Sequence, residues 1–248
     1  FHLAGQTFVP AAWRDPWATF EANVRMQLNL LTALVDAGRA TRLVAVTSNE
    51  VYGAGPADRA RRCDERAPLA PLNPYAVSKA AQDLLAAQYV ASHGLDVVRV
   101  RPFTHVGPRQ ADRFVSASFA RQVAEVEAGL RAEIRVGNLD AVRDFTDVRD
   151  IVRGYRLAAE RGERGAVYNL GSGVARAIGD VLDALRAAAR VDVPVVVDPA
   201  LLRPADSGRA VCDASLAGRA LGWRPEIGWD DTLRDILDDW RARVAAPV

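Results

Sequence analysis

Two short apolar segments enclose one long helical segment, and this arrangement constrains the fold more than any other feature of the sequence. Residues 42–48 (RLVAVTS) and residues 95–102 (LDVVRVRP) have the pattern of strands buried on both faces of a parallel sheet. Between them, residues 73–94 predict a helix with Asn73 as N-cap and Gly94 at its end. Strand, helix and strand in this order form a parallel β-α-β unit. The sequence therefore predicts an α/β fold.

Further segments extend this unit in both directions. A helix is predicted over residues 16–38, where apolar residues recur at helical spacing and Gly38 is a natural stop. After residue 105 the pattern changes to helices at 113–129, 148–162, 178–190 and 230–244, and short strands at 133–137, 166–171 and 193–198. We expect a core of nucleotide-binding type up to residue 105 and a smaller mixed α/β lobe after it, with a ligand between the two.

Charge and cysteine content exclude several classes of protein. The formal net charge is +1, so no strong field favours nucleic acid or an acidic membrane. No apolar stretch reaches the roughly 20 residues of a membrane span. Cys63 and Cys212 have no metal-ligand spacing and are interpreted as free thiols in a reducing compartment, which indicates the cytoplasm. His2, His93 and His105 are interpreted as structural, and no metal site is expected.

Lys79 is the single lysine among 32 basic residues, and it lies four residues after Tyr75. Residues at this spacing share one face of a helix. A nearby ammonium stabilises a phenolate and lowers the tyrosine pKa towards neutrality, which suits an acid-base catalyst. The flat guanidinium of arginine is no substitute for the compact ammonium. Taken alone, the pair also fits a tyrosine and a lysine on a helix surface.

Ser48 lies at the carboxyl end of the first predicted strand, and Glu50 lies two residues further on. Ligands of open α/β sheets bind at the carboxyl ends of the strands, and the helix that carries Tyr75 begins at the same edge. A hydroxyl there can hydrogen-bond a substrate oxygen and share its proton with a phenol, and Glu50 could be a second acid or base. The alternative is an ordinary polar strand exit.

Eight blocks of sequence occur in a specific order and cover essentially the whole chain. They are FHLAGQ, ANVRMQLNLL, TSNEVYG, PYAVSK, RPFTHVGP, VRDFTDVRD, YNLGSG and LRPAD. Together they resemble the extended short-chain dehydrogenase/reductase superfamily of nucleotide-sugar epimerases, dehydratases and reductases. The nearest branch resembles GDP-4-keto-6-deoxy-D-mannose reductases, with GDP-mannose 4,6-dehydratases close behind.

The resemblance implies a fold and a cofactor. Residues 1–105 would be the C-terminal part of a dinucleotide-binding domain, an incomplete Rossmann-type parallel sheet with helices on both faces. Residues 106–248 would be mainly the substrate lobe, with some segments returning to the core. The cofactor would be NADP or NAD, and the substrate a nucleotide sugar, preferably GDP-linked.

The resemblance also implies roles for individual residues. Ser48, Tyr75 and Lys79 would be catalytic, with Glu50 as a further acid or base. The cofactor would be bound by the turn Leu3, Ala4 and Gly5, by Asn23, Tyr75 and Lys79, and by Phe103 beside the nicotinamide.

Three further residues would contact the substrate. Thr104 stands where many members have asparagine, and Arg143 and Arg203 match arginines that hold the diphosphate. A guanidinium fork suits phosphate oxygens because it donates two parallel hydrogen bonds. For either arginine alone, a surface ion pair is the simpler interpretation.

The phosphate-binding motif G-x-x-G-x-x-G of the family is absent from the sequence. We therefore expect the chain to lack the first three strands, with the residue that selects NAD or NADP. The sequence would then be a fragment of a longer protein, or a natural truncation that no longer binds dinucleotide.

Three functions fit these observations. In a reductase, Tyr75 protonates the oxygen at C4 while the ketone is reduced. In a dehydratase, Tyr75 removes the C4 hydroxyl proton and Glu50 assists the loss of water; another NAD-dependent sugar-nucleotide epimerase or dehydratase belongs to this same alternative. A nucleotide-sugar-binding protein without turnover is the alternative of another class. A homodimer through helices 16–37 and 74–93 is expected from the family.

Overall fold

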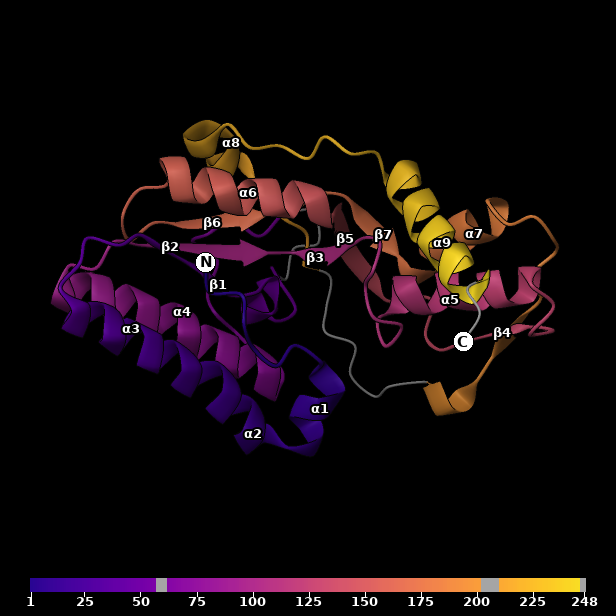
Figure 1. The fold of residues 1–248 in the computed structure, drawn as a ribbon, viewed down its shortest axis with the longest axis horizontal. Coiled ribbons are helices and arrows are strands. Elements are labelled where there is room, and N and C mark those ends of the chain that lie inside the picture. Colours follow the sequence, from indigo (N-terminus) through magenta and orange to yellow (C-terminus); the bar gives the residue numbers. More distant parts are fainter. Residues whose placement is uncertain (57–61, 202–209, 246–248) are drawn as a thin grey trace.

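The computed structural model describes residues 1–56, 62–201 and 210–245. Its main sheet is parallel, with strand order β1-β2-β6 (Figure 1). The strands are β1 (Leu43–Val46), β2 (Val97–Pro102) and β6 (Val167–Leu170). Val44 pairs with Val98, and Val100 pairs with Tyr168. On the other side of β1, His2 forms a parallel bridge with Ala45. The predicted Rossmann-type sheet is confirmed.

Helices cover both faces of this sheet, which explains why its strands are apolar throughout. Leu43, Ala45 and Val97 pack towards α3 (Met26–Ala37) and α4 (Pro74–His93). The alternate residues of β1 and β2 pack towards α6 (Val148–Arg161) and α8 (Ser215–Leu221). Figure 1 shows the two helix pairs on opposite sides of the sheet.

The long helix α4 begins and ends as the sequence predicts. The Asn73 side chain accepts a hydrogen bond from the Ala76 amide at 2.8 Å, and Gly94 ends the helix with a φ of 66°. The helix predicted over 16–38 is interrupted, however. It consists of α2 (Pro16–Phe20), a π-helical turn (Glu21–Arg25) and α3, and a short helix α1 (Val9–Arg14) precedes it.

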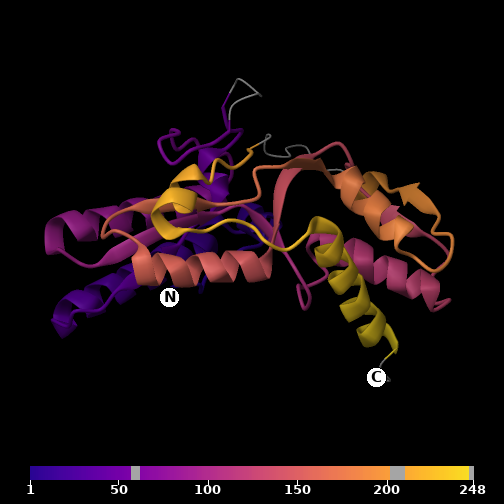
Figure 2. The same ribbon diagram turned by 90° about the horizontal axis from the view of Figure 1, so that it is seen from above.

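A second group of elements packs at the other end of the molecule (Figure 2). Strand β5 (Val142–Asp147) pairs in parallel with β3 (Thr104–Val106) and antiparallel with β7 (Ala175–Ala177). A separate parallel pair joins β4 (Ile134–Val136) and β8 (Val195–Val197). Around one apolar core lie α5 (Val115–Glu127), α7 (Ile178–Ala187) and α9 (Trp229–Ala245).

The chain passes between the two ends more than once. After β5 it returns along α6 to β6 in the main sheet, and later along α8. Two 3-10 turns, Asn49–Tyr52 and Pro199–Leu201, complete the elements. Cys63 and Cys212 are free and buried, and they face each other across an isolated parallel bridge. The domain boundary at residue 105 stays a prediction.

Candidate active site

Ser48 and Tyr75 meet at the carboxyl end of the main sheet. Ser48 follows β1 and its Oγ accepts a hydrogen bond from the Glu50 amide at 3.2 Å, while Tyr75 lies in the first turn of α4. The Ser48 hydroxyl lies close enough to the Tyr75 hydroxyl to act on its pKa. The sequence analysis expected these two hydroxyls at one edge of the sheet, and the structure places them there.

The environment of Tyr75 keeps its hydroxyl protonated. Burial raises the pKa of Tyr75 to about 12, the Ser48 hydroxyl opposes this rise, and the charge of Glu50 adds to it. The sequence predicted instead that Lys79 lowers this pKa towards neutrality. That lowering is absent from the structure because desolvation of the phenolate outweighs the other effects. At neutral pH, Tyr75 is a proton donor.

Lys79 is a buried cation that uses only part of its hydrogen-bond donors within the described residues. The residue is 4% exposed, and burial lowers the pKa of its ammonium to about 8. Its Nζ donates to the Val46 carbonyl at 3.2 Å, the one hydrogen-bond acceptor that the described residues offer it. An ammonium has three donors, and buried charges are normally paired. The remaining donors fit hydroxyl oxygens of a ligand, such as those of a cofactor ribose.

Gly5 lets the backbone of the N-terminal loop pass close to Lys79. A Cβ at this position would lie 2.8 Å from Asn23 Oδ1 and 3.8 Å from Lys79 Nζ. The other loop residues named by the resemblance, Leu3 and Ala4, are exposed, whereas Asn23 is fully buried. Because a glycine here permits close approach of another chain or ligand, the loop fits a cofactor beside Lys79.

Glu50 is tied to the start of the helix that carries Tyr75. Its Oε2 accepts a hydrogen bond from Asn73 Nδ2 at 3.0 Å, and the other end of the Asn73 side chain caps α4. One carboxylate oxygen of Glu50 thus has a structural partner next to Tyr75.

Phe103 belongs to the interior of the protein. Its residue is 1% exposed, and its ring stacks on Tyr52 with centroids 6.3 Å apart. The structure gives this ring little surface for contact with a ligand. Its assignment beside a nicotinamide stays a prediction.

Asp83 anchors α4 one turn beyond Lys79. Its buried carboxylate accepts hydrogen bonds from Arg99 at 2.8 Å and from two nitrogens of Arg101 at 2.8 and 2.9 Å. Burial alone would raise the pKa of Asp83, but the hydrogen bonds and charges of Arg101 and Arg99 hold it below its usual value. The sequence did not reveal this cluster, because it joins α4 to a strand through tertiary contacts.

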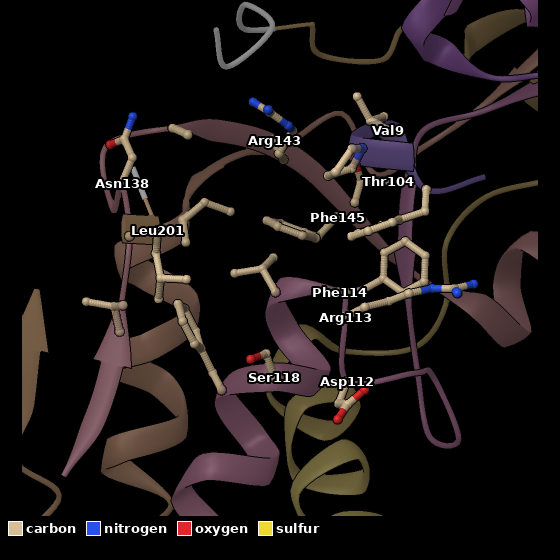
Figure 3. Close-up of a pocket in the computed structure, with 18 of the residues that line it drawn as sticks. Val9, Thr104, Asp112, Arg113, Phe114, Ser118, Asn138, Arg143, Phe145 and Leu201 are labelled. Carbon is tan, nitrogen blue, oxygen red and sulfur yellow. The ribbon is translucent and has the colours of Figure 1, made fainter. Parts of the chain in front are cut away.

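A cavity of about 460 Å³ is lined mainly by the second group of elements and, on one side, by residues 7–10 (Figure 3). Thr104 and Arg143, which the resemblance assigned to the substrate, line this cavity, and Arg143 donates to the Val142 carbonyl at 2.8 Å. Figure 3 shows Val9, Thr104 and Phe114 on one side and Asn138 and Leu201 on the other. Ser48, Tyr75 and Lys79 are outside its lining, but Thr104 follows Phe103 directly at the end of β2. Arg203 lies outside the described residues.

The sequence missed the wall of this cavity that the start of α1 and the two residues before it contribute. Thr7, Phe8 and Val9 line it, and Phe8 packs edge-on against Phe114 with centroids 6.2 Å apart. Arg113 lies over both rings, at 5.5 and 5.3 Å. The sequence did hold one indication that residues 7–9 lie near a ligand, because they begin two residues after Gly5, the last residue of the turn assigned to the cofactor.

Neither a metal-ligand cluster nor a membrane-spanning helix is present in the described part of the chain. No group of three or more His, Cys, Asp or Glu side chains in residues 1–56, 62–201 and 210–245 is placed to hold a metal ion. Within the same ranges, no helix has the length and hydropathy to cross a membrane.

Comparisons with known proteins agree with this geometry. The family model described as GDP-mannose 4,6 dehydratase matches residues 1–236. GDP-6-deoxy-D-mannose reductase of Pseudomonas aeruginosa is 42% identical over 244 residues, which cover 98% of this chain and 80% of that protein.

Two solved structures share the fold. RMD from Pseudomonas aeruginosa, complexed with NADPH, superposes with a TM-score of 0.91 at 41% identity, over 97% of this chain and 80% of that one. UDP-glucose 4-epimerase of Thermus thermophilus, in complex with NAD, gives a TM-score of 0.85 at 32% identity, over 96% and 76% of the two chains. The chain therefore belongs to the GDP-mannose 4,6 dehydratase family of the extended short-chain dehydrogenases/reductases.

Proposed function

We propose that this protein is a nucleotide-sugar oxidoreductase that reduces the C4 ketone of GDP-4-keto-6-deoxy-D-mannose with NADPH or NADH. The observation that carries the proposal is the placement of Tyr75, which is buried in the first turn of α4 beside Ser48 and four residues before the buried Lys79. Reduction of a ketone needs a proton donor at its oxygen, and a tyrosine with a pKa near 12 holds its proton until charge develops there. The relative named GDP-6-deoxy-D-mannose reductase supports the choice of substrate.

Each residue of the site has its own role in the proposed reaction. Ser48 and Tyr75 hydrogen-bond the ketone oxygen, and Tyr75 transfers its proton to that oxygen as the alcohol forms. Lys79 stabilises the resulting phenolate, which regains a proton from solvent. A bound reduced nicotinamide supplies the hydride that C4 accepts.

The cofactor and the sugar nucleotide would occupy different parts of the molecule. Lys79, Gly5 and the neighbouring Leu3 and Ala4 would hold the cofactor, with Asn23 and Phe103 behind them, in residues 1–105. The cavity lined by Thr104 and Arg143 would hold the sugar and diphosphate, mainly in residues 106–248. Arg143 is assigned to the diphosphate because its fork suits phosphate oxygens. Arg203 is assigned to the same group from sequence alone.

The second candidate is GDP-mannose 4,6-dehydratase activity. Glu50 favours it, because a carboxylate beside Tyr75 could assist the loss of water across C5 and C6, and the matching family model bears this name. Binding of a nucleotide sugar without turnover is the third.

Two incubations distinguish the reductase, the dehydratase and the nucleotide-sugar-binding protein. In the first, the protein receives GDP-mannose without reductant, and a 4-keto product is sought. In the second, it receives the 4-keto-6-deoxy sugar with NADPH, and loss of nicotinamide absorbance is followed. We expect turnover only in the second. Keto product in the first alone would establish the dehydratase, and GDP-sugar binding with no product in either would establish the binding protein.

Two further proposals concern the molecule in the cell. We infer a homodimer through the segments 16–37 and 74–93, because Trp17 and Leu84 are 71% and 60% exposed on them. We also assign the protein to the cytoplasm, because its cysteines are free thiols.

A further inference from the structure

Ser78 lies on α4 between Tyr75 and Lys79, and the proposed reaction gives it no role. Its side chain is fully buried. Its Oγ donates to the Tyr75 carbonyl at 2.7 Å and accepts from Asn23 Nδ2 at 2.9 Å. The hydroxyl therefore links the backbone of Tyr75 to a different element, the π-helical turn 21–25 that contains Asn23.

Asn23 continues this link to the N-terminal loop. Its Oδ1 accepts from the Gln6 amide at 2.7 Å, and its Nδ2 donates to the Gln6 carbonyl at 3.0 Å. An amide nitrogen has two hydrogens, and Gln6 and Ser78 take both. The side chain of Asn23 thus has no donor left for a cofactor, and what it binds is the loop beside the cofactor.

The backbone around Asn23 is held as firmly as its side chain. Its carbonyl accepts from Gln82 Nε2 of α4 at 2.8 Å, in addition to the helical bond from Met26. A side chain on Gly5 would displace the amide, because its Cβ would come within 2.8 Å of Asn23 Oδ1. The π-helical turn, α4 and the loop therefore fix one orientation of Asn23.

We propose that Ser78 is a positioning residue for the reaction. Together with Asn23 and Gln6 it forms a clamp that holds the Gly5–Gln6 loop in register with Tyr75. The loop and α4 are distant in sequence, and the clamp is a continuous line of hydrogen bonds from one to the other. Displacement of a reacting group by about 1 Å can lower a rate by about 100-fold, so a fixed register affects catalysis directly. The inference rests on the proposed function for its effect on rate.

The first test needs neither cofactor nor substrate. Amide hydrogen exchange is measured on the ligand-free protein and on Ser78→Ala. We expect the segment containing Gln6 to exchange at least about 10-fold faster in the variant, because the Gln6 backbone N–H donates to Asn23 Oδ1 and the Asn23 side chain has lost its contact with Ser78. The matched control is Ser116→Ala in α5, which is as fully buried and whose Oγ has no hydrogen-bond partner among the described residues. The control should leave exchange of the Gln6 segment unchanged.

The second test separates positioning from folding. We expect Ser78→Ala to lower kcat by about 10- to 100-fold while KM for the nucleotide sugar changes by less than about 2-fold. Cofactor affinity, followed by fluorescence titration, should weaken. In the double variant with Asn23→Ala, the losses should not add, because both changes break the same line of contacts.

Three results would overturn the clamp: unchanged exchange at Gln6 in Ser78→Ala, a kcat close to that of the unchanged protein, or additive losses in the double variant. An equal effect of Ser116→Ala would also overturn it, since general loosening would then explain the data. Failure of the proposed function shows itself differently, as absence of ketone reduction by the unchanged protein, and the exchange experiment decides the clamp in that case.

Discussion

Tyr75 and Lys79 share one helix face, but burial acts on them in opposite senses. It raises the pKa of the phenol to about 12 and lowers that of the ammonium to about 8. Both shifts favour the uncharged side chain. At neutral pH the site therefore holds a protonated phenol that can donate its proton, and a cation that hydrogen bonds to a ligand would stabilise.

The proton donor is tested by Tyr75→Phe, which removes the hydroxyl and keeps the ring. We expect kcat for ketone reduction to fall by about 100- to 10,000-fold, because no other group protonates the forming alkoxide. Binding of GDP, measured by calorimetry, should stay unchanged. Reduction at an undiminished rate would show that the proton comes from elsewhere.

The buried ammonium makes a prediction about stability. Below pH 8, Lys79 is protonated in both the folded and the unfolded chain, so its desolvation destabilises the fold fully. Between pH 8 and 10.5, the folded chain releases the proton before the unfolded chain does, and the cost disappears. Lys79→Met should therefore raise the free energy of unfolding at neutral pH by roughly 2–3 kcal/mol.

Urea unfolding across this pH range measures the effect. The gain from Lys79→Met should vanish near pH 10.5, whereas Lys79→Arg, which keeps its charge, should show no recovery. A gain that does not depend on pH would mean that packing, not charge, explains the result.

At the scale of elements, α4 is held to the sheet by a buried ion cluster. Asp83→Asn should lower the free energy of unfolding by about 3 kcal/mol, since Arg101 would be left buried with its charge unbalanced. The loss should shrink in acid, because a lowered pKa stabilises the fold above the usual value of 3.8 and this contribution disappears as pH falls through the folded value.

Glu160→Gln is the matched control for this cluster. Glu160 pairs with Arg156 at 2.9 Å on the exposed side of α6, and surface pairs contribute only about 0–1 kcal/mol. Chemical denaturation of both variants compares them. Equal effects of the two substitutions would contradict a special role for Asp83.

Elements whose signals are local were predictable from the sequence. Helix α4 has its cap at Asn73 and its stop at Gly94 within its own residues, and β1 is apolar because both faces are covered. The π-helical turn at 21–25 was not predictable, because the sequence has no local signal for it, and the contacts that Asn23 makes from this turn join segments far apart in the chain.

The strands and contacts that the sequence did not predict also depend on residues far apart in the chain. Strand β5 reads VRDFTD, of which four of six residues are charged or polar, and its pairing partners β3 and β7 are three residues long. Of the site, the Ser48–Tyr75 contact followed from sheet topology. The anchoring of Asp83 and the α1 wall of the cavity depend on residues far apart in the chain.

At the scale of the whole molecule, the exposed apolar side chains of α2 and α4 predict self-association. Leu84→Arg should convert the proposed dimer to a monomer, because a charge would be buried without a partner at the interface. Light scattering after gel filtration measures the mass. Leu130→Arg is the control: Leu130 is 70% exposed just beyond α5, away from these helices. A monomeric unchanged protein would contradict the proposed interface.

The strand order β1-β2-β6 has a consequence for biosynthesis. The partner of β2 on one side is β6, and the ribosome makes β3, β4, β5 and two helices before it reaches Val167. Until then, one edge of β2 has no strand beside it, and an open apolar edge is where nascent chains aggregate. Pairing across such a long connection is also slow. Cells that make this protein should therefore need chaperone protection of the growing chain until Leu170 has emerged.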